Sequence, residues 1–318
     1  FTNGRCTQNG HVDSVTLRPY LTFLHMRFQM VNVLVVGKRG PIAQRMRMVL
    51  YQDALYNVNT VDTGFALATD AIDNDVVILC GQESSSSLIL PKISARSHVI
   101  DVGPVFRCHP NWDYGNFRAG VQELPGKRVA VPGCFATAAI LAIEPLVSSY
   151  VLPNDINLCL RATGGYTVGG HRLVEKANQG ILSMCDVVMN LDTLHHHVAE
   201  IKQATGLVGN VSLIPNIREH PSGVMIVTTF EETGSLSRDT IEQLYRRVYA
   251  NRSDICVHEQ KTMSQIRSDA YMDREGAGIS VHSDGSFIHV VSWLDNLRMG
   301  SVSTAKQLID GIFHESVE

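Results

Sequence analysis

Residues 31–43 read VNVLVVGKRGPIA, and this stretch decides the fold. It opens with an apolar, β-branched run typical of a buried parallel strand. Gly37 and Gly40 follow directly, and apolar residues then recur at helical spacing from Ile42 to Leu50. Glycines let a backbone approach a pyrophosphate, whose charge the helix N-terminus stabilises. Strand, glycine turn and helix therefore favour a dinucleotide-binding unit, although the G-x-x-G-x-x-A spacing also fits an ordinary tight turn.

The residues expected to contact a dinucleotide lie in this turn and at the end of a neighbouring strand, where parallel sheets bind ligands. They are Gly37, Lys38, Arg39, Gly40, Pro41, Ile42 and Cys80. The choice of cofactor stays open at this point. Asp62 follows a strand expected over 58–61 and could accept a ribose 2′-hydroxyl, which would favour NAD. Lys38 and Arg39 could instead hold a 2′-phosphate, which would favour NADP.

Strand and helix patterns alternate through the first part of the chain. Strands are expected over 58–61, 75–80 and 97–102 with helical segments between them, which predicts a doubly wound parallel sheet. Beyond residue 134, strand-like runs have few helices between them, which predicts a mostly antiparallel sheet. The expected fold class is α/β, with a Rossmann-like domain and an α+β catalytic domain.

The 318 residues are enough for two domains at about 150 residues each. Residues 30–133 together with 297–318 are expected to bind the dinucleotide, and residues 134–296 to carry catalysis and oligomerisation. A helix over 301–313 is expected to return to the first domain. Residues 1–29 carry three arginines against one aspartate and are set apart as an extension of unknown role.

Composition excludes several classes of protein. The formal net charge is −4, with 44% apolar and 18% charged residues, which describes a folded chain with a large core rather than a disordered one. This mild acidity gives no reason to expect nucleic acid as a partner. The longest apolar run, 129–143, contains Pro132-Gly133 and is too short and broken to span a membrane. The seven cysteines form no C-x-x-C pair, which argues against a disulfide framework or a zinc site and favours a reducing compartment, the cytoplasm.

A second informative stretch surrounds one cysteine. Residues 128–143 read RVAVPGCFATAAILAI, in which a short strand ends at Pro132-Gly133 and an alanine-rich helix begins near Cys134. Such a sulfur lies close to unpaired N–H groups of the first helical turn, so the helix dipole favours thiolate over thiol. A thiolate is the nucleophile that acyl chemistry needs. We therefore expect Cys134 to be a nucleophile of lowered pKa; the alternative, a buried inert cysteine, suits Cys159 better.

The run VPGCFATAA around Cys134 resembles the active-site segment of the N-acetyl-gamma-glutamyl-phosphate reductase family, in the semialdehyde dehydrogenase superfamily, which commonly reads P-G-C-Y-x-T. Four further segments are similar to motifs of the shorter type of this enzyme and come in the same order. Residues 99–107 resemble I-D-x-S-x-D-F-R, 163–170 resemble the S-G-Y-S-G-G-G loop, 195–201 resemble H-x-H-x-P-E-I, and 295–300 resemble D-N-L-x-K-G-A. The resemblance covers most of residues 30–318.

Several positions depart from these motifs, which could shift the substrate or weaken activity. The aspartate of D-F-R and the first serine of the glycine loop are replaced. So are the basic residue after the glycines, the proline of the histidine motif and the lysine after D-N-L. The residues that stand there are Val105, Gly164, His171, Ala199 and Met299. The cysteine and both histidines of the motif are retained.

The resemblance implies an NADPH-dependent reduction of N-acetyl-gamma-glutamyl phosphate to N-acetylglutamate semialdehyde in arginine biosynthesis. It also implies a homo-oligomer, either a dimer or a tetramer. Cys134 would attack the acyl phosphate and form a thioester. His195 or His197 would be the base, since histidine exchanges protons near neutral pH, and the sequence does not choose between them.

Further roles come from the same resemblance. Arg107 and Glu200 would contact the substrate; a surface salt bridge is the alternative for Arg107. Gly164 and Gly165 would lie in a flexible loop that contacts the cofactor, or form a turn between strands. Asn296 would contact the nicotinamide, or cap a helix. No metal is expected, because no further ligand cluster lies at zinc-like spacing from the histidine run, which could also be a solvated surface segment.

Two other functions stay open. The chain could be a different semialdehyde dehydrogenase, of the aspartate or lysine pathway, although the histidine motif and glycine-rich segment favour the glutamyl branch. It could also be a non-catalytic nucleotide-sensing relative, which the replaced motif positions allow.

Overall fold

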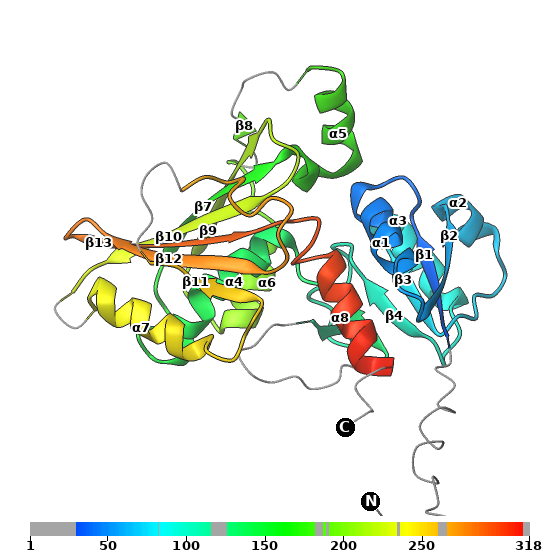
Figure 1. The fold of residues 1–318 in the computed structure, drawn as a ribbon, viewed down its shortest axis with the longest axis horizontal. Coiled ribbons are helices and arrows are strands. Elements are labelled where there is room, and N and C mark those ends of the chain that lie inside the picture. The colour runs from blue at the N-terminus through cyan, green and yellow to red at the C-terminus, as the bar shows by residue number, and fades with distance from the viewer. Residues whose placement is uncertain are drawn as a thin grey trace, which may run out of the picture.

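The computed structural model describes residues 30–81, 83–115, 126–181, 187–188, 191–233, 236–259 and 266–313. Two sheets organise these residues, and Figure 1 shows them next to one another with helices around each. The expected extension over 1–29 lies outside the described residues. None of the helices in the described part is long and apolar enough to cross a membrane.

The first sheet is parallel throughout. Its six strands run in the order β2-β1-β3-β4-β6-β5, so the chain starts inside the sheet and winds in both directions. The strands are β1 (Val31–Val36), β2 (Tyr56–Val61), β3 (Val76–Leu79), β4 (His98–Asp101), β5 (Asp113–Tyr114) and β6 (Arg128–Ala130). The predicted doubly wound parallel sheet is confirmed, and the apolar runs mark its strands to within about two residues.

Helices cover both faces of this sheet, as a parallel sheet requires. They are α1 (Pro41–Tyr51), α2 (Thr63–Ala68), α3 (Glu83–Ile89), the short 3₁₀ helix η2 (Leu90–Lys92) and α8 (Val302–Phe313). Alternate residues of β1 enter opposite cores, Val33 and Val35 with α1 and α8, Leu34 and Val36 with α2 and α3. The last described helix thus returns to the first sheet, as expected (Figure 1).

The second sheet is mixed. Its strands run in the order β11-β12-β13-β10-β7-β9-β8. They are β7 (Leu158–Gly165), β8 (Val187–Val188), β9 (Val211–Arg218), β10 (Val224–Glu231), β11 (Ile255–Val257), β12 (Ala277–Ser283) and β13 (Phe287–Leu294). Most neighbours are antiparallel, as predicted, but β7 pairs with β9 and β11 with β12 in parallel.

Three helices pack against one face of the mixed sheet: α4 (Cys134–Ser148), α6 (His197–Thr205) and α7 (Arg238–Val248). The Ala-rich helix α4 is buried along most of its length, because small side chains let β10 and β13 approach it closely. Only residues 131–133 separate β6 from α4. The first turn of α4 therefore lies at the carboxyl edge of the parallel sheet.

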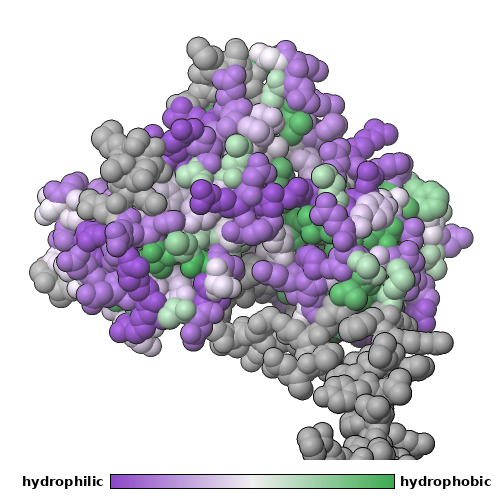
Figure 2. Space-filling view, viewed as in Figure 1, coloured by the Kyte–Doolittle hydropathy of each residue, from purple (hydrophilic) through white to green (hydrophobic). Residues whose placement is uncertain are grey.

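The glycine-rich segment after β7 differs from the flexible loop that the sequence suggested. Gly164 and Gly165 are the last residues of β7, followed by a 3₁₀ helix, η3 (Tyr166–Gly169), and by α5 (Gly170–Asn178). No residue of α5 is buried, and Figure 1 shows this helix projecting away from the mixed sheet. Figure 2 shows a mainly hydrophilic surface on the same side of the molecule, with its apolar residues in small separate patches.

Candidate active site

Cys134 is the first residue of α4, as the sequence predicted. The preceding Gly133 is the N-cap and offers no side chain to the free N–H groups of the first turn. Val131 donates its N–H to the Asp101 carbonyl at 2.8 Å, which ties this entry to the end of β4. The sulfur is therefore held at a helix N-terminus at the edge where parallel sheets bind ligands.

Gly133 is needed for its small size. A Cβ at this position would overlap the ring of His197 and come within 2.5 Å of Nη1 of Arg107. Both side chains can therefore pack directly on the backbone beside Cys134. The Pro-Gly pair does more than turn the chain, because it leaves room for an imidazole and a guanidinium beside the start of α4.

Glu200, on α6, is the centre of this cluster. Its side chain is 2% exposed. Oε2 accepts hydrogen bonds from Gly133 N at 2.9 Å and Tyr114 Oη at 3.0 Å. Oε1 lies 2.6 Å from His197 Nδ1 and 3.2 Å from Arg107 Nη1. Burial acts to raise the pKa of Glu200, but His197 and Arg107 outweigh it and lower the pKa to about 2, so the carboxylate is ionised.

Each nitrogen of the Arg107 guanidinium donates a hydrogen bond. Besides Glu200, it donates from Nε to the Val131 carbonyl at 3.0 Å and from Nη2 to the Val102 carbonyl at 3.3 Å. Its side chain is 10% exposed, so the surface salt bridge offered as an alternative is wrong. The structure places both expected substrate residues, Arg107 and Glu200, beside Gly133, where they bind each other and the backbone.

The expected low pKa of Cys134 is wrong for the structure as it stands. Burial raises the pKa of this thiol to about 11, although Arg107 and the Phe135 amide act in the opposite direction. The helix terminus acts to lower the pKa of Cys134, but desolvation outweighs it, and desolvation depends on the packing around α4. The resting sulfur is therefore a thiol, and its chemistry requires a base.

Two of the three consecutive histidines are buried, so the run is not a solvated surface segment. The ionised Glu200 can only accept, so Nδ1 of His197 carries the hydrogen and Nε2 is left as an acceptor. His195 has the other arrangement, since its Nδ1 accepts the backbone N–H of His197 at 3.2 Å. Burial lowers the pKa of His195 to about 4, so its ring is neutral with the hydrogen on Nε2. The hydrogen-bond network thus makes His197 a proton acceptor and His195 a donor.

The rings of His195 and His197 both contact the ring of Phe135, the residue that follows Cys134. The Phe135 ring meets His197 edge-on at 6.2 Å and His195 at 6.4 Å between centroids. Within the described part of the chain, the run 195–197 is also the one group whose ligand atoms lie close enough together for a metal, within 4.8 Å of one another. The rings of His195 and His197 are stacked with their centroids 4.9 Å apart.

The glycine turn between β1 and α1 has the features of a pyrophosphate site. Gly37 has a φ of +115°, and a Cβ there would lie 2.9 Å from the carbonyl oxygen of Cys80 on the neighbouring strand end. Gly40 is the N-cap of α1 without a side-chain cap, and a Cβ there would meet nothing within 4 Å. Pro41 starts the helix, and Ile42 packs partly into the core below. The turn is therefore open above Gly40, where the helix N–H groups are free for an anion.

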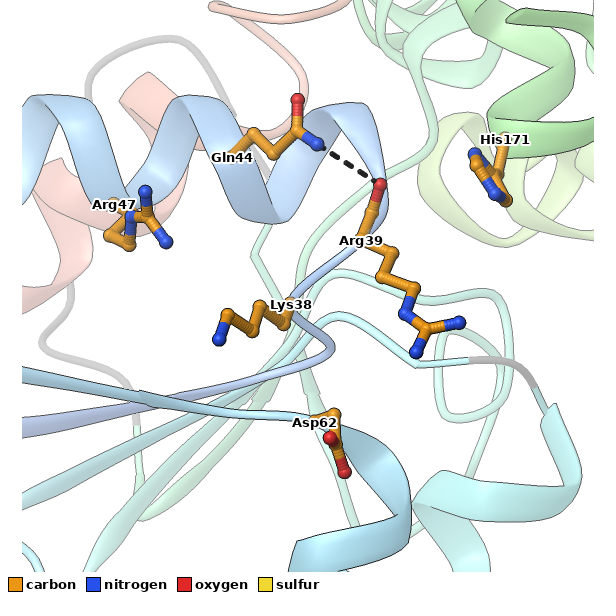
Figure 3. Close-up of a pocket in the computed structure, with 6 residues that line it drawn as sticks. All are labelled: Lys38, Arg39, Gln44, Arg47, Asp62 and His171. Atoms are coloured by element: carbon orange, nitrogen blue, oxygen red, sulfur yellow. Dashed lines mark hydrogen bonds between the residues drawn. The ribbon is translucent and has the colours of Figure 1, made fainter. Parts of the chain in front are cut away.

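Beside this turn lies an open cavity of about 520 Å³ (Figure 3). Its lining residues are Lys38, Arg39, Gln44, Arg47, Asp62 and His171. Among the described residues, no carboxylate forms an ion pair with the three cations, Lys38, Arg39 and Arg47. Asp62 is occupied as the N-cap of α2, since its Oδ1 accepts the Phe65 N–H at 2.8 Å. The cavity therefore has an excess of positive charge suited to a phosphate.

The sequence missed two members of this cavity that matter for charge. Arg47 lies on α1, two helical turns from the glycine turn, and its position off the apolar stripe indicated only a solvated face. His171 comes from α5, more than a hundred residues away along the chain. Its departure from the family motif was visible, but the short, exposed helix that carries it was not.

Gly164, Gly165 and Asn296 are used in packing. A Cβ on Gly164 would lie 3.0 Å from the Phe135 ring, and one on Gly165 would lie 2.5 Å from the His220 carbonyl oxygen. Asn296 accepts the Gly223 N–H at 3.0 Å and donates from Nδ2 to Thr167 Oγ1 at 2.9 Å. These contacts join β13, β10 and η3, so the Asn296 side chain braces the segment that leads to α5 and caps no helix.

Comparisons with known proteins agree with this geometry. Residues 134–296 match the family described as semialdehyde dehydrogenase, dimerisation domain. N-acetyl-gamma-glutamyl-phosphate reductase from Brucella anthropi is 26% identical over 254 residues, which are 73% of this chain and 81% of the relative. The enzyme of that name from Brucella ovis is 26% identical over 251 residues, with the same coverage.

Solved structures show the same fold. Aspartate semialdehyde dehydrogenase II from Vibrio cholerae has a TM-score of 0.67 at 12% identity, covering 91% of this chain and all of that one. A probable aspartate-semialdehyde dehydrogenase from Pseudomonas aeruginosa has a TM-score of 0.67 at 13% identity, covering 90% of this chain and all of that one. Since the family match spans just over half of the residues, the chain belongs to the semialdehyde dehydrogenase family.

Proposed function

We propose that this chain catalyses the NADPH-dependent reduction of N-acetyl-gamma-glutamyl phosphate to N-acetylglutamate semialdehyde, a step of arginine biosynthesis. The observation that carries the proposal is the cluster at Gly133, where Cys134 begins a helix beside a buried His197–Glu200 pair. The Brucella relatives bear the name of this activity, and the segment that resembles the histidine motif of the family supplies both members of that pair.

The glycine turn and the charged cavity suit NADPH, which when bound supplies the hydride. Gly37 and Gly40 would let the pyrophosphate reach the N-terminus of α1. Lys38, Arg39 and Arg47 would surround the 2′-phosphate, whereas Asp62 has one carboxylate oxygen engaged at the start of α2. We therefore infer NADP rather than NAD, because three cations without an ion-pair partner among the described residues favour the extra phosphate.

His197 acts as the base in the first half of the reaction. Its Nδ1–H is fixed by Glu200, so Nε2 takes the proton of the Cys134 thiol as the sulfur attacks the acyl carbon. The C–O bond to phosphate then breaks, a thioester forms, and the imidazolium returns its proton to the departing phosphate. Glu200 remains ionised and stabilises the imidazolium, and Arg107 balances the carboxylate while His197 is neutral.

His195 acts in the second half. Reduction of the thioester carbon leaves a negatively charged hemithioacetal oxygen, and the Nε2–H of His195 is the donor that can stabilise it. Collapse of this species breaks the C–S bond and releases the semialdehyde, and the Cys134 thiolate then takes a proton from solvent, which restores the resting thiol for the next cycle. Arg107 and Glu200 are positioning residues in this scheme, since their side chains bind each other, His197 and the backbone.

Turnover with defined substrates tests the proposal. Full-length protein should reduce NADP in the presence of phosphate and N-acetylglutamate semialdehyde, and should be slower with aspartate semialdehyde or with NAD. Faster turnover of aspartate semialdehyde would assign the chain to that branch of the family. Folded protein that binds NADPH but turns over none of a panel of semialdehydes would identify a nucleotide-sensing relative.

The organisation of the protein follows from the same proposal. Residues 30–133 with 297–318 would bind NADPH, and residues 134–296 would carry the nucleophile and join the subunits through the mixed sheet. We propose a homo-oligomer, dimer or tetramer, which sedimentation equilibrium would distinguish from a monomer. The described cysteines are all free, which suits a reducing compartment such as the cytoplasm.

A further inference from the structure

His171 links two parts of the molecule that meet at the cofactor cavity. Lys38 and Arg39 come from the turn after β1, whereas His171 comes from α5, which follows the mixed sheet. Figure 3 shows His171 across the cavity from the turn that carries Arg39. In the related motif a basic residue stands at this position, so this chain places a smaller group there.

The base of α5 is firmly held although the helix itself is exposed. Tyr166 N donates to the His220 carbonyl at 3.0 Å, and Thr167 donates from N at 3.1 Å and from Oγ1 at 2.6 Å to the Pro221 carbonyl. Asn296 adds its hydrogen bond to Thr167 Oγ1. Since no residue of α5 is buried, the hydrogen-bonded η3 is the segment that fixes the position of the start of this helix, where His171 lies.

The charges that face His171 are unbalanced. Its Nε2 lies 3.1 Å from Oε1 of Glu175 on the same helix, and both side chains are about half exposed. The cavity adds the unpaired cations of Lys38, Arg39 and Arg47, and the Asp62 carboxylate that caps α2. A phosphate entering the cavity would compete with Glu175 for the imidazole, because it brings more negative charge and more acceptor oxygens.

We propose that His171 is a specificity-determining residue, which donates a hydrogen bond from α5 to a phosphate of NADPH and so couples cofactor binding to the mixed-sheet part of the molecule. The inference rests on the proposed function, since it assumes NADPH in this cavity. An arginine at this position would offer the same phosphate a bidentate pair of donors.

The test measures the Kd of NADPH for the full chain in the absence of substrate, with the fluorescence of the nucleotide as the signal. His171→Ala should raise the Kd of NADPH about fivefold, the range expected for one hydrogen bond. His171→Arg should restore tight binding. Arg172→Ala removes a neighbouring exposed cation of α5 that does not line the cavity, and should leave the Kd unchanged.

Binding of NADH, which lacks the 2′-phosphate, shows which phosphate of NADPH His171 contacts. A loss confined to NADPH places the His171 contact at the 2′-phosphate, and an equal loss for NADH places it at the pyrophosphate. Unchanged binding of both nucleotides by His171→Ala, in a protein where Arg39→Ala weakens NADPH, would overturn the inference and leave the proposed function standing. A wild-type chain that binds no NADPH would instead overturn the proposed function.

Discussion

The Glu200 cluster and the cofactor cavity hold charge in opposite ways. Around Glu200 the charged side chains are buried, and each charge is matched by a partner, so the arrangement exists before any substrate arrives. In the cavity three cations face solvent with no carboxylate paired to them among the described residues. In the proposed mechanism the Glu200 cluster positions the nucleophile and its base. The positive charge of the cofactor cavity is balanced only when an anionic ligand binds. Removing a charge should therefore destabilise the protein in one region and weaken only binding in the other.

The largest effect is expected where the nucleophile is lost. Cys134→Ser should reduce turnover about 10³-fold or more, because a serine hydroxyl beside a neutral histidine is a much weaker nucleophile. The Kd of NADPH should stay within about twofold of wild type, since the cavity lies on other elements. Steady-state kinetics and nucleotide binding on the same preparation measure both. Turnover near the wild-type rate would reject Cys134 as the nucleophile.

Glu200→Gln tests the Glu200 cluster, in which each charge has a partner. The amide keeps the shape but leaves the buried Arg107 without its counter-ion, so the free energy of unfolding should fall by about 3 kcal/mol. Turnover should fall as well, because Nδ1 of His197 loses its anionic partner. Asp73→Asn is the matched control, since Asp73 pairs with Arg96 on the surface and its loss should leave the Tm almost unchanged. Equal stability losses in the two variants would show that burial of the Glu200 pair has no special importance.

The double variant Lys38→Ala/Arg39→Ala tests the cofactor cavity. The Kd of NADPH should rise about 100-fold, because two charge-assisted contacts to phosphate are lost. The Tm without nucleotide should stay the same or rise slightly, since removing two of three neighbouring cations relieves repulsion. Isothermal titration with NADPH and thermal unfolding measure the two quantities. A large loss of Tm would contradict the distinction between the regions.

These two regions also differ in how far the sequence predicted them. Apolar runs located the strands, and the Pro-Gly pair located the start of α4 at Cys134, because both are local patterns. His197 lies three residues from Glu200, but the other partners of this carboxylate lie 67 to 93 residues away, so local spacing could not reveal the whole cluster. The raised pKa of Cys134 has the same cause, since desolvation depends on how distant segments pack. α5 escaped prediction because a short helix with no buried residue has no apolar stripe to mark it.

Asp101 sharpens the comparison as a buried carboxyl between the two regions that lacks a full set of partners. Its Oδ1 accepts the Gly103 N–H at 3.2 Å, whereas Oδ2 has no hydrogen-bond partner among the described residues. Burial raises the pKa of Asp101 to about 6, although the Gly103 amide and Arg107 act in the opposite direction. The folded state therefore binds this proton more tightly than an unfolded aspartate with a pKa of about 3.9.

The sign of the pH dependence follows from that difference. Stability from the protonated Asp101 is fully present below about pH 3.9 and is lost as the pH rises through about 6, at a cost of roughly 3 kcal/mol. Glu200 has the reverse dependence, since its lowered pKa makes its contribution fade only as the pH falls toward about 2. Urea unfolding of wild type and Asp101→Asn at pH 4.5 and 7.5 isolates the first effect, because the other titrating groups are common to both proteins. The variant should gain on the wild type at the higher pH, and an unchanged difference between the two pH values would show that Asp101 is ionised throughout.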